Sequence, residues 1–153
     1  MSSRLFQSIR ETHGLCYSIY SWSSQYADTG LHGIVTALSR DTEMRALRLI
    51  SDELRRLLDE GVTGDELSRV REQVKSNLIM SLESTSARMQ KLGQGELTFG
   101  HSLSPDEIIE CYDAVTCEDI LSLARSMYGK AGMSFSAVGR VASLEDYLSC
   151  IDL

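Results

Sequence analysis

The spacing of apolar residues changes from helical to alternating near the start of the chain. Leu5 to Ile9 follow helical spacing, and Gly14 predicts the end of that element. Residues 15–22 then alternate, which predicts a strand with Leu15, Tyr17 and Ile19 on one face and Cys16, Ser18, Tyr20 and Trp22 on the other. Residues 31–38 form a second predicted strand. Residues 23–30 carry turn chemistry, so we expect an antiparallel pair with a rather long connection.

Two long amphipathic helices are predicted next. Asp41 is a candidate N-cap, apolar residues recur at three- and four-residue steps from Met44 to Leu58, and Gly61 marks the end. Thr63 and Glu66 form a capping box that opens the second helix, whose apolar face runs from Leu67 to Leu82. We expect these helices to pack as an antiparallel hairpin.

Shorter elements fill the rest of the chain. Residues 83–89 keep helical spacing, and Gly93, Gly95 and Gly100 are predicted to break it. Two more helices are predicted to begin at Ser104-Pro105 and at Thr116. Met133 to Val138 alternate like a strand, and Ser143 caps a last helix. Clustered strands followed by clustered helices predict an α+β fold, with an antiparallel sheet covered by helices on one face and a single domain over residues 1–153.

Charge and composition exclude some partners. The net charge is −7 and no basic run occurs, so neither nucleic acid nor an anionic membrane is an expected partner. No apolar run approaches the ~18 residues of a membrane span, and no signal peptide is apparent. Cys16, Cys111, Cys117 and Cys150 lie in apolar periodic segments without Cys-x-x-Cys spacing. We expect buried, reduced thiols and a cytoplasmic location.

No self-sufficient catalytic constellation is encoded. His13, His32 and His101 are scattered, and a His-x-x-Glu-His helix motif is absent in either direction. A Gly-x-Ser-x-Gly elbow is also absent, and Cys16 is too close to His13 along the chain to form a Cys/His dyad. We therefore expect no catalytic residue, no metal site and no cofactor in this chain alone.

Arg10 and Tyr17 allow two interpretations. In a structural role, Arg10 would interact with the carbonyl end of the first helix, and Tyr17 would be a half-buried strand aromatic. In a functional role, a guanidinium and a phenol beside a sheet could both hydrogen-bond the carbonyl groups of an extended peptide, and the phenol could donate to a developing oxyanion. The spacing of the residues alone favours the structural role.

Several segments together resemble one family. Residues 10–18, Arg-Glu-Thr-His-Gly-Leu-Cys-Tyr-Ser, look like a segment of the pitrilysin/insulinase zinc metallopeptidases, in the later, non-catalytic half of those proteins. Residues 1–6, 26–30, 61–67, 81–89 and 113–120 resemble further family segments in the same order. The similarity extends over nearly the whole chain.

The resemblance implies a fold, a partner and two binding residues. Family members enclose a peptide chamber between two homologous α+β halves, of which the earlier half carries the zinc. The resemblance therefore implies that Arg10 and Tyr17 bind peptide substrate, that the partner is a zinc-binding half domain, and that zinc belongs to that half. It also implies that a strand and an early helix of the family pattern would precede Met1, so the domain is expected to be truncated at its N-terminus.

Two other functions stay open. The chain could be a stand-alone structural or protein-interaction subunit of the same fold, or a residual domain without a present function. A missing strand would leave a sheet edge open, from which we expect self-association, most simply as a homodimer.

Overall fold

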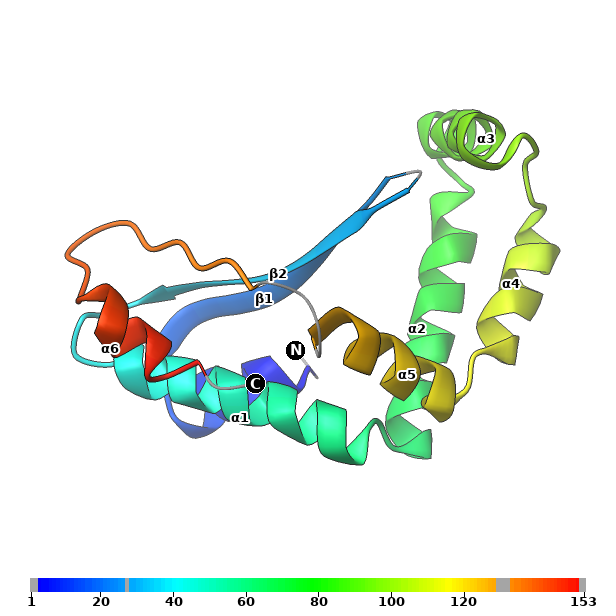
Figure 1. Cartoon of the computed structure of the whole chain (residues 1–153). Coiled ribbons are helices and arrows are strands. Elements are labelled where there is room, and N and C mark those ends of the chain that lie inside the picture. Colours follow the sequence, from blue (N-terminus) through cyan, green and yellow to red (C-terminus); the bar gives the residue numbers. More distant parts are fainter. Residues whose placement is uncertain (1–2, 27, 129–132, 152–153) are drawn as a thin grey trace. The chain divides into compact units, whose positions relative to one another are not determined.

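The computed structural model describes residues 3–26, 28–128 and 133–151, which form two compact units (Figure 1). The first unit comprises Met1–Glu60 and Ala124–Leu153, and the second comprises Gly61–Leu123. The first unit contains the π-helix η1 (Phe6–Thr12), the strands β1 (Cys16–Gln25) and β2 (Gly30–Leu38), and the helices α1 (Glu43–Glu60) and α6 (Leu144–Leu148). The second contains α2 (Gly64–Ser81), α3 (Thr85–Phe99) and α4 (Pro105–Ala114), while α5 (Cys117–Tyr128) begins in the second unit and ends in the first.

The strands β1 and β2 form the predicted antiparallel pair. The connection is shorter than expected, because β1 continues to Gln25 and β2 begins at Gly30. Trp22 lies opposite Gly33, and a Cβ atom at Gly33 would lie 2.6 Å from Nε1 of the Trp22 ring. The tryptophan ring therefore occupies the space that any other residue at position 33 would need.

Helices pack against one face of this sheet, as the α+β prediction requires. Ile9 of η1 and Ile19 of β1 are buried together with Ala46, Leu47 and Ile50 on one face of α1. Tyr147 and Cys150, at and just after α6, complete the buried cluster. The three- and four-residue spacing seen in the sequence thus corresponds to the core-facing stripe of α1.

Helix caps largely follow the sequence. Capping boxes open α2 at Thr63, α4 at Ser104 and α6 at Ser143, and Pro105 occupies the first turn of α4. Asp41 is not the N-cap of α1, since the helix begins at Glu43 and Thr42 precedes it. The Thr42 hydroxyl donates to the carbonyl of Leu15 at 3.2 Å, which ties the start of α1 to the start of the sheet.

The prediction that three glycines break the third helix is wrong for two of them. Gly93 and Gly95 lie inside α3, which ends at Gly100 in the left-handed conformation with φ +73°. A Cβ atom at Gly95 would lie 3.2 Å from the carbonyl oxygen of His101, so glycine there lets the following loop pass close to the helix.

The predicted strand over residues 133–138 is not formed in the part of the chain that the structure describes. The alternating pattern is present, but the segment pairs with neither β1 nor β2. Phe135 instead packs against Tyr147, with ring centroids 4.7 Å apart, and Val138 is fully exposed. An alternating pattern becomes a strand only where a neighbouring strand accepts its backbone hydrogen bonds.

Within the second unit, α2 is joined to α4 by Arg71. Its guanidinium donates to the carbonyls of Tyr112 and Val115, at 3.1 and 2.6 Å, at the end of α4. Because α1 and α2 belong to different units, the predicted hairpin of these two helices stays a prediction. Among the described helices, none is both long and apolar enough to cross a membrane.

Candidate functional site

Arg10 lies on η1, and its side chain is held between two aromatic rings. The guanidinium carbon lies 4.8 Å from the centre of the Phe6 ring and 5.2 Å from the centre of the Tyr17 ring. Phe6 precedes Arg10 by one turn of η1, while Tyr17 comes from β1. Gly14, with φ +60°, turns the chain between these elements. The structure therefore brings the two candidate residues together, with Phe6 as a third member.

Tyr17 owes its position to an irregularity in β1. Cys16 pairs with Leu38 and Ile19 pairs with Thr36, so β1 has one residue more than β2 between these pairs. Such a bulge disturbs the alternation of side chains and redirects one of them. Leu15 and Ile19 are buried, whereas Tyr17 is 84% exposed. The prediction that Tyr17 shares a face with these two residues is wrong, and the bulge is the reason.

The polar groups of Arg10 and Tyr17 are uncommitted. Over the residues that the structure describes, neither the guanidinium nor the phenol hydroxyl makes a hydrogen bond or an ion pair. The guanidinium carbon lies over both rings, and its N–H groups, which make no bond within the described residues, can donate to a ligand. Together the two side chains offer hydrogen-bond donors to carbonyl or carboxylate oxygens.

A hollow of about 460 Å³ lies beside this pair on η1. Its lining residues are Phe6, Gln7, Glu11 and Thr12. Phe6 is shared, because its ring also contacts the Arg10 guanidinium. The candidate site therefore has two parts. One is the cluster of Phe6, Arg10 and Tyr17 side chains, and the other is the adjoining hollow, in which Glu11 supplies the one carboxylate.

The histidines are dispersed, and each has a local partner. Nδ1 of His13 lies 2.7 Å from the Ser8 carbonyl, and Nδ1 of His101 lies 3.1 Å from the Phe99 carbonyl. Nδ1 of His32 lies 2.7 Å from the hydroxyl of Tyr128, whose pKa is raised by burial. Within the described residues, no three His, Cys, Asp or Glu side chains are placed to hold a metal ion together.

The cysteines differ from the sequence expectation in part. All four are free thiols, but Cys150 alone is buried, Cys16 and Cys117 are partly exposed, and Cys111 is exposed. The Cys150 thiol lies 3.6 Å from the sulfur of Met44. Periodic position in a helix predicted burial for Cys111, but α4 has no buried residue.

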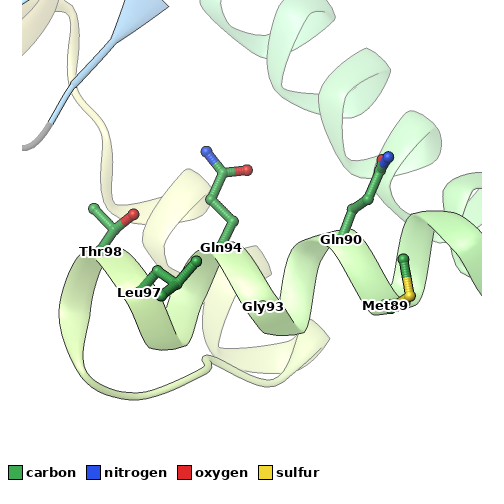
Figure 2. Close-up of a pocket in the computed structure, with 6 residues that line it drawn as sticks. All are labelled: Met89, Gln90, Gly93, Gln94, Leu97 and Thr98. Carbon is green, nitrogen blue, oxygen red and sulfur yellow. The ribbon is translucent and has the colours of Figure 1, made fainter.

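A second hollow, of about 570 Å³, lies on α3 and contains none of the predicted residues (Figure 2). Its lining comprises Met89, Gln90, Gly93, Gln94, Leu97 and Thr98. Gly93 contributes no side chain, which opens a gap along the helix surface between Met89 and Leu97. This hollow has no ionisable group in its lining and is shallow.

Sequence reasoning identified Arg10 and Tyr17 but overlooked Phe6 and the residues of the hollow. Phe6 and Arg10 are four positions apart, a spacing that places side chains on one face of a helix. That spacing was the available signal for Phe6. Nothing in the sequence pattern distinguished Gln7, Glu11 and Thr12 from ordinary surface residues.

Comparison with known proteins finds a matching family and similar bacterial proteins. The family described as "Peptidase M16 inactive domain" matches residues 1–74, which include Arg10 and Tyr17. An uncharacterized zinc protease of Streptomyces coelicolor is 37% identical over 139 residues, covering 91% of this chain and 30% of that protein. The uncharacterized zinc protease YmxG of Bacillus subtilis is 40% identical over 128 residues, covering 84% of this chain and 31% of that protein.

A solved structure has a similar fold over most of this chain. The crystal structure of a conserved protein from Enterococcus faecalis V583 matches with a TM-score of 0.69 and 28% identity. The match covers 80% of this chain and 28% of the other. The chain thus matches 28–31% of the length of these three proteins.

Proposed function

The chain belongs to the M16 peptidases as an inactive C-terminal half domain, and from this membership we propose that it supplies the substrate-binding half of a zinc-dependent peptide hydrolase. The family resemblance seen in the sequence is confirmed. The role in binding substrate is our proposal, and so is the assignment of Arg10 and Tyr17 as the residues that bind it.

One observation carries the proposal. The Arg10 guanidinium is fixed between Phe6 and Tyr17 while its hydrogen-bonding edge makes no bond within the described residues. A purely structural arginine would donate to the carbonyl end of η1, and a purely structural Tyr17 would be half-buried. Tyr17 is instead 84% exposed. Two uncommitted donors on one surface suit the carbonyl groups of an extended peptide.

The proposed reaction needs a second half domain. We infer that a zinc-bearing half, separate from residues 1–153, supplies the metal and the attacking water. Zinc there would polarise the scissile carbonyl and lower the pKa of its bound water. In this arrangement Arg10 holds a peptide carbonyl, and the Tyr17 hydroxyl donates to the oxyanion that forms as water attacks. Such donors act by stabilising charge that develops in the transition state.

The experiment combines this chain with a zinc-bearing M16 half domain and measures peptide hydrolysis. We expect the chain alone to cleave no peptide and the mixture to be active. Tyr17→Phe should lower turnover about ten- to a thousandfold, the range found when a single oxyanion donor is removed. Because Tyr17 makes no hydrogen bond in the described structure, the variant should keep its unfolding midpoint.

Tyr26→Phe is the matched control, since Tyr26 is also exposed and directly follows the end of β1. It should leave turnover unchanged. If Tyr17→Phe were as active as the wild type, the Tyr17 hydroxyl would have no role in the reaction, and a structural role for the residue would be favoured. Stoichiometric zinc in the isolated chain, with hydrolysis that a chelator abolishes, would contradict the division of labour between the halves.

A further inference from the structure

His13 directly follows η1 and is bonded to that helix by both its backbone and its side chain. Its backbone N–H donates to the carbonyl of Arg10. Nδ1 of its imidazole lies 2.7 Å from the carbonyl oxygen of Ser8, in a partly buried contact. A carbonyl oxygen can only accept a hydrogen bond, so Nδ1 carries the proton and donates it to Ser8.

The side-chain bond of His13 spans the position of Arg10. Ser8 precedes Arg10 by two residues and His13 follows it by three, so the imidazole closes the part of the helix in which Arg10 lies. The backbone N–H of Gly14 also donates to the Arg10 carbonyl, at 3.0 Å. The main chain at Arg10 is therefore held by bonds from the residues that follow the helix.

η1 is a π-helix, which makes this support important. Helices of this type are rare, occur mostly as single turns and are frequent at functional sites. η1 extends over seven residues, of which Ile9 is the buried one. If the end of η1 relaxed to α-helical hydrogen bonds, Arg10 would turn about the helix axis. Because Tyr17 belongs to β1, that rotation would change the direction of the guanidinium relative to the Tyr17 ring.

We propose that His13 is a positioning residue of the candidate site. Its bond to the Ser8 carbonyl holds η1 in the form that places Arg10 over the rings of Phe6 and Tyr17. The effect of His13 on peptide binding rests on the proposed function, whereas its effect on the position of Arg10 can be measured in the chain alone.

The first measurement is NMR of the full 153-residue chain. Protons over an aromatic ring are shifted upfield, so the Arg10 Nε–H signal should lie upfield of that of an exposed arginine such as Arg48. Arg10→Lys identifies the signal by its absence. His13→Phe keeps a ring but removes the donor, and we expect it to lose most of the upfield shift. His13→Ala, which removes the ring as well, should do the same.

Two matched variants separate the donor from the rest of the side chain. His13→Asn places an amide N–H as many bonds from the backbone as Nδ1 of histidine, so it should restore much of the upfield shift. His101→Phe is the control, because Nδ1 of His101 also lies close to a carbonyl oxygen, that of Phe99 at 3.1 Å, but in the second unit. It should leave the Arg10 signal unchanged. Circular dichroism verifies that each variant is folded.

The second measurement is peptide hydrolysis by the chain combined with a zinc-bearing half domain. His13→Phe should raise KM about two- to tenfold, the equivalent of one hydrogen bond. It should leave kcat nearly unchanged, because Arg10 is proposed to hold the peptide carbonyl equally in the ground state and the transition state. If His13 merely stabilised the fold, the variant would lower kcat through loss of folded protein and would leave KM as in the wild type.

The outcomes separate the two proposals. If His13→Phe keeps the upfield shift of Arg10, or if His13→Asn behaves like His13→Phe, the positioning role is overturned and the proposed function stands. If the upfield shift is lost but KM does not change, His13 does position Arg10, and the proposed role of Arg10 in binding substrate fails.

Discussion

At the scale of single residues, the Arg10 side chain is notable because its guanidinium contacts aromatic rings but makes no hydrogen bond within the described residues. Two aromatic rings hold the guanidinium at 4.8 and 5.2 Å, and the described structure provides no carboxylate or carbonyl for it. Contacts of this kind are worth about 0.5–1 kcal/mol at exposed sites, which is enough to orient a side chain but contributes little to folding. The contribution to folding is therefore small, and the proposed role in substrate binding would account for this arrangement.

Arg10→Lys tests this explanation, because lysine keeps the charge but lacks the flat, forked donor group. In the reconstituted two-half enzyme we expect kcat/KM to fall about tenfold, the equivalent of one charge-assisted hydrogen bond. The free energy of unfolding should change by less than about 1 kcal/mol. Arg48→Lys, an exposed arginine on α1, is the control and should change neither quantity. A loss of stability equal to the loss of activity would favour a structural role for Arg10.

The sequence could identify Arg10 and Tyr17 but not how they meet. Family-like spacing named the two residues, and Gly14 correctly predicted the turn between them. The extra residue in β1 has no local signature, because a bulge arises from the pairing of two strands rather than from either strand alone. Simple alternation, which takes no account of the bulge, predicted that Tyr17 shares a face with Leu15 and Ile19.

At the scale of elements, helix starts were predictable and strand partners were not. A capping box satisfies backbone donors within four residues, so Thr63, Ser104 and Ser143 mark helix starts whatever surrounds them. Residues 133–138 have the alternation of a strand, but strand formation depends on a partner elsewhere in the chain. Gly93 and Gly95 show the same limit, since a helix tolerates glycines at about 1 kcal/mol each when its surroundings favour it.

Acid should weaken the starts of α4 and α5. The backbone N–H and the hydroxyl of Ser104 lower the pKa of Glu107, and the hydroxyl and backbone N–H of Thr116 lower the pKa of Asp119. A carboxyl whose pKa is lower in the folded state contributes its stabilisation fully above its unfolded pKa. That contribution is lost as the pH falls through the folded pKa.

Side-chain titrations followed by NMR provide the measurement. Ser104→Ala and Thr116→Val should each raise the pKa of the paired carboxyl. The rise should be larger for Asp119, because the hydroxyl bond is the largest cause there, whereas the backbone bond is the largest for Glu107. Unchanged pKa values in both variants would show that the hydroxyls do not hold these carboxylates.

Arg71 should contribute to the connection between α2 and α4, together with Lys75, whose ammonium donates to the Asp113 carboxylate at 3.0 Å. The two bonds of Arg71 to the Tyr112 and Val115 carbonyls satisfy acceptors at the end of α4 that the helix itself cannot satisfy. Arg71→Ala should lower the free energy of unfolding by about 2 kcal/mol, as expected for hydrogen bonds from a charged donor. Arg69→Ala is the control in urea denaturation, because Arg69 donates to Asp65 within α2 and should cost far less. Equal effects of the two variants would contradict the assignment.

At the scale of the whole molecule, apolar burial is uneven between the two units. The buried cluster that includes Ile9, Ile19 and Ile50 belongs to the first unit. In the second unit Leu78 is buried, whereas α3 has no buried residue among those described. Regions with few buried apolar contacts open at lower free energy. The first unit, which contains the candidate site, is therefore the better anchored part of the chain.

The sheet leaves backbone groups available for pairing. In the described structure β1 and β2 pair with each other alone, so each has an outer edge without a strand partner. One face of the pair also exposes four apolar side chains: Tyr20, Trp22, Leu31 and Val35. Open edges and an apolar face together are a template for association with another chain.

We therefore expect the isolated chain to self-associate, most simply as a two-fold dimer in which equivalent surfaces cover one another. Sedimentation velocity at micromolar concentration should show a species heavier than the 17.0 kDa monomer. Val35→Lys places a charge beside Tyr20 on the exposed face and should shift the equilibrium toward monomer. Val70→Lys, at an exposed position on α2, is the matched control and should leave the equilibrium unchanged. Adding a zinc-bearing half domain should compete with self-association if both use this sheet. A monomeric wild type at these concentrations would mean that the open edges need no partner.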